Sequence, residues 1–153
     1  MYKRQDRVSA DEVIVLEISD VPESVMSTVS IKEPSFVPKE VVKKIRDGRV
    51  YYDVEGALPN GSEIEFDVLM TDKGPEIVEI QRDLLWESVP QAAQDLVNSA
   101  NKDKLEVVRV IESQQTDDSI IYEVFVAGKS SDPYFEVRVD RQGAELLEAR
   151  WKH

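Results

Sequence analysis

The sequence predicts an α+β protein built from two tandem αββββ repeats, with antiparallel sheets and the helices packed on one face. Near the end of the chain, residues 135–139 alternate apolar and charged side chains with the period of a strand that has one buried face. Residues 140–143, Asp-Arg-Gln-Gly, then predict a turn. The same succession appears earlier, where residues 66–70 alternate before Asp-Lys-Gly at 72–74. The sequence therefore predicts that one structural unit occurs twice in the chain.

Length and composition allow such a duplication. The chain has 153 residues, of which 41% are hydrophobic, so it can bury a core. A single unit of about 70 residues buries too little surface to be comfortably stable, and a second unit removes that difficulty. We expect residues 1–20 to form a lead-in or short strand, residues 21–85 the first repeat and residues 86–153 the second.

The first repeat needs one decision between helix and strand. Residues 11–18 predict a short strand or an extended lead-in, and a helix then begins at Val21 and ends before Pro34. Residues 37–45 could open another helix, but residues 40–45 align with residues 106–111, which are rich in β-branched side chains. We therefore expect a strand there. Further strands are expected, in order, at residues 50–57, 64–70 and 76–82.

The second repeat shows the same order more clearly. Residues 89–100 carry an apolar stripe at helical spacing, and strands are expected at residues 105–112, 119–127, 134–140 and 144–151. Trp86 and Trp151 are interpreted as packing anchors. The side chains expected to face the core are Tyr52, Val54, Phe66, Val68, Tyr122, Val124, Phe135, Val137 and Val139.

The repeated motif resembles a known family. It consists of Val-Pro, an amphipathic helix, a Glu-Val-Val strand, a Tyr-(Asp/Glu)-Val strand and a Phe-(Asp/Glu)-Val hairpin. This order is similar to that of the PepSY-like family, and most of all to its beta-lactamase-inhibitor-like members, in which tandem units occur. The resemblance covers nearly all of the chain after residue 20. It implies a bacterial protein outside the cytoplasm, periplasmic or secreted, with an inhibitory or protein-binding role and no catalytic residues.

Composition excludes several kinds of chemistry. There is no cysteine, and His153 is the only histidine, which argues against thiolate or histidine metal sites and against nucleophilic triads. Acidic residues number 31 against 19 basic ones, and the net charge of −12 disfavours nucleic acid. Residues 72–74 and 140–143 could suggest calcium, but each places a cation inside the loop, so hairpin turns are the better interpretation. We expect no enzyme, cofactor or metal.

The candidate site is a partner-binding patch on the outward side of the sheets. Aromatic and arginine side chains among charges are typical of protein interfaces. The residues chosen on this basis are Tyr51, Leu69, Phe125, Tyr134 and Arg138. The expected function is a non-enzymatic module that engages a protein or peptide, and the alternative is a carrier of a small apolar ligand held between helix and sheet. No apolar run suggests membrane insertion, and the first ten residues lack the apolar segment of a signal peptide.

Overall fold

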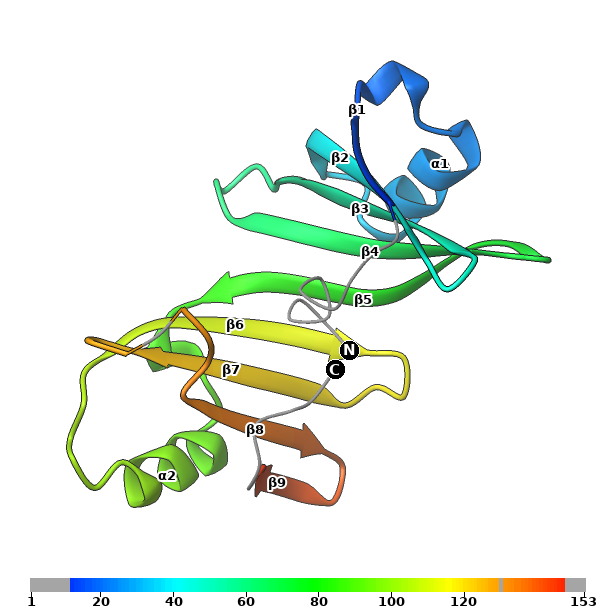
Figure 1. Cartoon of the computed structure of the whole chain (residues 1–153). Coiled ribbons are helices and arrows are strands. Elements are labelled where there is room, and N and C mark those ends of the chain that lie inside the picture. The colour runs from blue at the N-terminus through cyan, green and yellow to red at the C-terminus, as the bar shows by residue number, and fades with distance from the viewer. Residues whose placement is uncertain (1–11, 130, 148–153) are drawn as a thin grey trace. The chain divides into compact units, whose positions relative to one another are not determined.

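Strands dominate the molecule. The computed structural model describes residues 12–129 and 131–147, and within them 52% of residues are in strands and 19% in helices. Sheet order follows chain order from β1 to β9 in an antiparallel sheet (Figure 1). The expected fold class, two αββββ repeats with helices packed on one face, is therefore wrong. The two α-helices have ten residues each and bury two side chains apiece, so the strands and not the helices form most of the structure.

Two compact units divide the chain, Met1–Gln81 and Arg82–His153, and each is described by itself. The elements of unit 1 are β1 (Glu12–Leu16), the 3₁₀ helix η2 (Ile18–Asp20), α1 (Glu23–Lys32), β2 (Val37–Arg46), β3 (Arg49–Ala57), β4 (Glu63–Thr71) and β5 (Gly74–Leu84), whose last residues belong to unit 2. The segment that could have been read as a second helix is the strand β2, as the alignment with residues 106–111 predicted.

The core of unit 1 lies between α1 and one face of its strands. Val25 and Val29 of α1 are buried in the same cluster as Val41, Val54 and Phe66. These three strand residues lie side by side, because Val41 pairs with Val54 and Val54 pairs with Phe66. A buried valine or phenylalanine side chain contributes roughly 1.5–3 kcal/mol, so this column determines which side of the strands faces inward.

Unit 2 has a similar succession of elements. They are η3 (Trp86–Ser88), α2 (Gln91–Ala100), β6 (Val107–Gln115), β7 (Ile120–Val126), β8 (Phe135–Asp140) and β9 (Gly143–Leu146). Ala93 and Val97 of α2 pack with Val124 and Val137 of the strands, and Trp86 lies against the same cluster. The remainder of the strand expected at 144–151, with Trp151, lies outside the described residues.

The expected inward face is largely confirmed. Eight of the nine expected side chains are buried, and Val139 is half-buried near the end of β8. The turns are also as predicted: Gly74 and Gly143 have φ of 111° and 134°, a left-handed region in which glycine is favoured. The described residues contain no helix long and apolar enough to cross a membrane.

Candidate functional site

The residues of the expected patch fall in both units. Tyr51 on β3 and Leu69 on β4 are direct cross-strand partners in unit 1, and both are half-buried. In unit 2, Phe125 on β7 is half-buried and Tyr134, just before β8, is 37% exposed. Arg138 is on β8. The structure therefore brings Tyr51 and Leu69 together in one unit and leaves the other three residues in the second unit.

Each of the three aromatic rings carries a cation on its face. The guanidinium carbon of Arg46 lies 5.6 Å from the centre of the Tyr51 ring, and that of Arg109 lies 5.6 Å from the Phe125 ring. The ammonium of Lys129 lies 5.5 Å from the Tyr134 ring. A cation at this distance is attracted by the negative face of the ring. These rings are thus held in place among charges.

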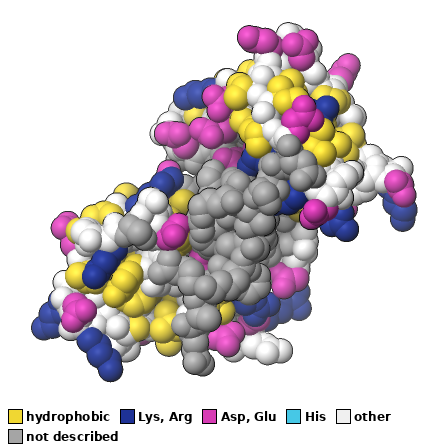
Figure 2. Space-filling model, in the orientation of Figure 1, with side chains coloured by type: hydrophobic (Ala, Val, Ile, Leu, Met, Phe, Trp, Pro, Cys, Tyr) yellow, Lys and Arg dark blue, Asp and Glu magenta, His cyan; other side chains and the backbone are white. Residues whose placement is uncertain are grey.

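Sequence reasoning missed the cations themselves. Arg109 is the direct cross-strand partner of Phe125, and its Nε also lies 2.9 Å from Asp83 Oδ1. The contact between Arg109 and the Phe125 ring depends on the register between residues 107–115 and 120–126. This register is known only once the two strands are paired. On the face shown in Figure 2, hydrophobic side chains reach the surface between acidic and basic ones. In protein interfaces such charged and polar side chains belong to the rim, and the centre is depleted of charged residues.

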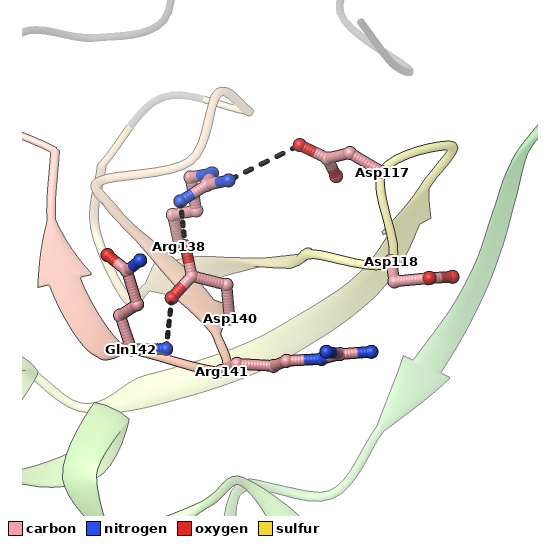
Figure 3. Close-up of a pocket in the computed structure, with 6 residues that line it drawn as sticks. All are labelled: Asp117, Asp118, Arg138, Asp140, Arg141 and Gln142. Atoms are coloured by element: carbon pink, nitrogen blue, oxygen red, sulfur yellow. Dashed lines mark hydrogen bonds and ion pairs between the residues drawn. The ribbon is translucent and has the colours of Figure 1, made fainter.

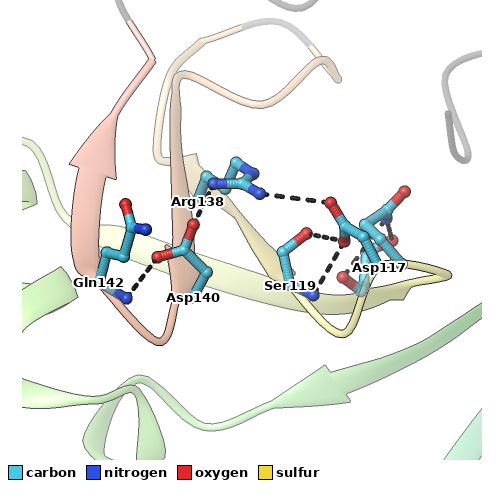
Figure 4. A network of polar contacts seen from close by, with 7 residues as sticks. Asp117, Ser119, Arg138, Asp140 and Gln142 are labelled. Carbon is cyan, nitrogen blue, oxygen red and sulfur yellow. Dashed lines mark hydrogen bonds and ion pairs between the residues drawn. The ribbon is translucent and has the colours of Figure 1, made fainter.

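Arg138 belongs to a polar network instead of an aromatic stack. Its Nη1 donates to Asp140 Oδ2 at 2.5 Å and its Nη2 donates to Asp117 Oδ2 at 3.3 Å (Figure 4). The backbone N–H of Gln142 donates to Asp140 Oδ1 at 2.8 Å, and that of Ser119 donates to Asp117 Oδ1 at 2.9 Å. The guanidinium is therefore clamped between two aspartates that their own turns hold in place.

The protonation states of this network follow from its hydrogen bonds. The Ser119 side chain and backbone, followed by Arg138, lower the pKa of Asp117 to about 2. The backbone N–H of Gln142, followed by Arg138, lowers the pKa of Asp140, and both aspartates raise the pKa of Arg138. Carboxylates with lowered pKa values are poor general acids near neutral pH.

Residues of this network line an open cavity of about 280 Å³. It lies between the β6–β7 and β8–β9 turns and is lined by Asp117, Asp118, Arg138, Asp140, Arg141 and Gln142 (Figure 3). In the view of Figure 3, the side chain of Arg141 extends on the side of the cavity where Asp118 lies. The described residues contain no group of three acidic, histidine or cysteine side chains arranged to hold a metal ion.

A second charged cluster lies on the outward side of the unit 1 strands. Asp53 on β3 is directly opposite Asp67 on β4, and Lys44 on β2 forms an ion pair with Asp53. Burial is the main reason why the pKa of Asp67 is well above its usual value, and the charges of Asp53, Glu79 and Glu65 raise it further. Two adjacent carboxylates cannot both ionise cheaply in a buried place, so Asp67 keeps its proton to a higher pH than a free carboxyl group does.

Unit 2 has a corresponding acidic pair. Glu123 on β7 is directly opposite Glu136 on β8, and both are buried, at 1% and 3% exposure. Glu123 and Glu136 alternate with core-facing side chains and therefore lie on the outward side of their strands, where both are nonetheless buried. Strand alternation tells which side a residue faces but not what covers that side.

Comparison with known proteins gives a fold and no function. The chain matches no protein-family model, and no curated protein is significantly similar in sequence. A solved structure, that of a DUF2874 family protein from Bacteroides uniformis, is similar with a TM-score of 0.57 and 18% sequence identity. The match covers 84% of this chain and 87% of that one. At this identity the likeness concerns the fold alone, and the PepSY-like resemblance stays a prediction.

Proposed function

We propose that this protein is a non-enzymatic module that binds a protein or peptide through outward-facing side chains of its strands. The observation that carries the proposal is the set of aromatic rings held under cations outside the two cores. Tyr51 lies under Arg46 and beside Leu69, and Phe125 lies under Arg109. Aromatic and arginine side chains contribute much of the binding free energy of protein interfaces, and rings that are already oriented lose little entropy on binding.

Tyr134 adds an exposed element to the patch in unit 2. It is 37% exposed and its ring lies edge-on to Phe135, with 4.9 Å between ring centres. Because Phe135 belongs to the core cluster of unit 2, Tyr134 is anchored on a rigid support. An exposed ring with its orientation fixed is suited to the centre of a binding patch.

The alternative, a carrier of a small apolar ligand, has less support. Such a carrier needs an apolar cavity of several hundred Å³. Under the helices, Val25 and Val29 of α1 and Ala93 and Val97 of α2 are buried in the two cores. The cavity at the turns of unit 2 is lined by charged and amide side chains. A role as an inhibitor outside the cytoplasm rests on the PepSY-like resemblance and forms part of the same proposal.

The proposal is tested by capturing a partner and then measuring its affinity with purified components. A photo-crosslinking residue at position 51 or 125 identifies proteins from the native envelope fraction that touch the patch. The purified partner is then titrated against the wild type and against Tyr51→Ala, Phe125→Ala and Tyr134→Ala. Loss of a well-packed aromatic anchor is expected to weaken binding by at least about tenfold.

The matched control is Ile31→Ala, because Ile31 is apolar, 81% exposed on α1 and outside the patch. It should leave the affinity unchanged. Equal affinity for all three aromatic variants and for Ile31→Ala, with folding verified by circular dichroism, would refute the proposal.

A further inference from the structure

The turn between β3 and β4 contains an asparagine followed by a glycine, Asn60-Gly61. The chain has two other asparagines, Asn98 and Asn101, which are followed by serine and lysine. The backbone nitrogen after an asparagine can attack the side-chain amide carbon, because both belong to one chain and together close a five-membered ring. Glycine hinders this attack least, since it carries no side chain beside its nitrogen. Asn60 is therefore the asparagine whose sequence most favours the reaction.

The turn leaves both residues open to solvent. Asn60 and Gly61 are exposed, and a Cβ atom at Gly61 would meet no atom within 4 Å. Gly61 has a φ of 89°, a backbone conformation that favours glycine, so the shape of the turn accounts for the glycine after the asparagine. The atoms that would react are thus accessible to water and to hydroxide.

A hydrogen bond within the turn prepares the side-chain amide for attack. The backbone N–H of Ser62 donates to Asn60 Oδ1 at 2.9 Å. A donor at this oxygen draws electrons from the amide carbon and stabilises the negative charge that the oxygen acquires during the attack. The same bond holds the Asn60 side chain against the main chain of its own turn. Both effects favour ring closure.

Asn98 and Asn101 are placed differently. Asn101 Nδ2 donates to the Leu105 carbonyl oxygen at 2.9 Å, and Asn101 Oδ1 accepts from the Leu105 N–H at 3.0 Å, so both ends of this amide are held. Asn98 lies within α2, where the following backbone N–H belongs to the hydrogen bonds of the helix. The chain thus contains two internal standards that should react slowly.

One hydrogen bond opposes the reaction at Asn60. The backbone N–H of Gly61 donates to the Leu58 carbonyl oxygen at 2.9 Å, and this bond must open before the nitrogen can attack. It lies at the tip of a hairpin, and exposed loop tips open locally at a free energy far below that of global unfolding. The bond therefore slows the reaction without preventing it.

We infer that Asn60 is a site of spontaneous covalent modification, at which the folded chain deamidates to aspartate and isoaspartate. The Gly61 nitrogen loses its proton to hydroxide and forms a bond to the Asn60 side-chain amide carbon. The bond from that carbon to Nδ2 breaks, and the nitrogen leaves as ammonia after taking a proton from water, which restores the hydroxide.

Water then opens the five-membered imide that has formed. Opening at the bond between the nitrogen and the side-chain carbon gives aspartate, whereas opening at the bond to the main-chain carbon gives isoaspartate. In the whole reaction one water is consumed and one ammonia is released. No enzyme or cofactor takes part.

The product changes the turn in two ways. It adds a negative charge near the exposed Glu63, in a chain whose net charge is already −12. Isoaspartate also lengthens the main chain between Leu58 and Ser62, whose N–H to carbonyl hydrogen bond of 2.9 Å closes the turn. This end of the hairpin is therefore expected to loosen. Tyr51 and Leu69 pair near the other end of the same strands, so the inference is independent of the proposed binding patch.

The experiment incubates the folded, full-length protein in water labelled with heavy oxygen, at neutral and at mildly alkaline pH. Mass spectrometry of the resulting peptides follows all three asparagines. The peptide with residue 60 should gain one heavy oxygen atom, contain isoaspartate as well as aspartate, and react faster at the higher pH. Asn98 and Asn101 should react at least about tenfold more slowly, because their attacking nitrogens are hindered or held.

Three variants serve as controls. Asn60→Gln would need a six-membered ring and should stay unmodified at position 60 over the same time. Gly61→Ala places a methyl group beside the attacking nitrogen and should slow the reaction by at least about tenfold, with folding verified by circular dichroism. Asn60→Asp has the added charge but not the longer main chain. Amide hydrogen exchange of residues 57–63 should therefore be faster in the isoaspartate form than in Asn60→Asp.

Four results would each overturn the inference. Aspartate without isoaspartate at position 60 would mean that no ring forms. Equal rates at the three asparagines, or an unchanged rate in Gly61→Ala, would mean that the Asn60-Gly61 turn does not direct the reaction. An intact Asn60 in the folded protein, while a peptide of residues 57–63 reacts, would mean that the hydrogen bond to Leu58 prevents it.

Discussion

The two units place different residues at the same position of a strand. In unit 1, β3 continues from Val54 to Gly56, whereas in unit 2, β7 continues from Val124 to Val126. Val126 is 4% exposed and fills the core of its unit. Gly56 leaves space that Phe36 fills from outside the strand, and the ring of Phe36 lies edge-on to Phe66 with 5.0 Å between centres. At this strand position the core is therefore filled by Val126 of the strand itself in unit 2. In unit 1 it is filled by Phe36, which lies outside the strand.

This difference makes Gly56 the most sensitive position of unit 1. A Cβ atom at Gly56 would overlap the carbonyl oxygen of Val37 and would lie 2.8 Å from two atoms of the Phe36 ring. Because the oxygen belongs to the backbone, β2 would have to move. Gly56→Ala is expected to lower the free energy of unfolding by about 3 kcal/mol, measured by urea denaturation.

The control for this prediction is Gly48→Ala. Gly48 has a φ of 75°, but a Cβ there would meet no atom within 4 Å. Its cost is therefore backbone strain alone, about 1 kcal/mol. If the two substitutions cost the same, the close approach of Val37 to Gly56 does not determine the stability of unit 1.

Both units contain a pair of acidic residues that face each other across two strands. Asp53 and Asp67 face each other in unit 1, and Glu123 and Glu136 face each other in unit 2. Burial raises the pKa of Asp67, and Asp53, Glu79 and Glu65 act in the same direction, while Lys44 forms its ion pair with Asp53. The folded protein thus keeps a proton that the unfolded chain releases near pH 3.9.

The sign of the pH dependence follows from this difference. The stability contributed by Asp67 is complete below about pH 3.9 and is lost as the pH rises through the raised folded pKa, at about 1.4 kcal/mol per pH unit. Asp67→Asn cannot ionise and should remove this decline, so that the variant is more stable than the wild type at the upper end of the window. Urea denaturation at a series of pH values measures the slope. The matched variant in unit 2 is Glu136→Gln. If the dependence of stability on pH is unchanged in Asp67→Asn, the assignment of the proton to Asp67 is contradicted.

Strand positions and the inward face could be predicted from the sequence because both depend on local alternation. Residues 40–45 were assigned correctly only by comparison with residues 106–111, since their own pattern also fits a helix. Phe36 and Gly56 were not predicted as partners, because they are 20 positions apart and nothing local links a ring to a glycine. The buried charges Lys44, Asp53 and Glu136 were missed because burial on the outward side depends on neighbours that the alternation does not encode.

The turns that join equivalent strands differ as well. In unit 1, β2 and β3 are joined by Asp47 and Gly48, with φ of 52° and 75°. In unit 2, the β6–β7 turn contains Asp118 with φ of 68° and no glycine, and Asp117 beside it accepts hydrogen bonds from Ser119. Side-chain bonding to the backbone thus stabilises the turn of unit 2, while the turn of unit 1 contains a glycine with a positive φ.

The smallest predicted effect concerns this turn. Because the pKa of Asp117 is lowered to about 2, its stabilising contribution is present above about pH 3.9 and is lost as the pH falls towards 2. The two hydrogen bonds from Ser119 are the main cause and Arg138 is the lesser one. Carbon-13 NMR titration of the Asp117 carboxyl group should therefore show a larger upward shift of its pKa in Ser119→Ala than in Arg138→Ala. The reverse order would mean that the ion pair across the cavity, and not the turn itself, holds Asp117 ionised.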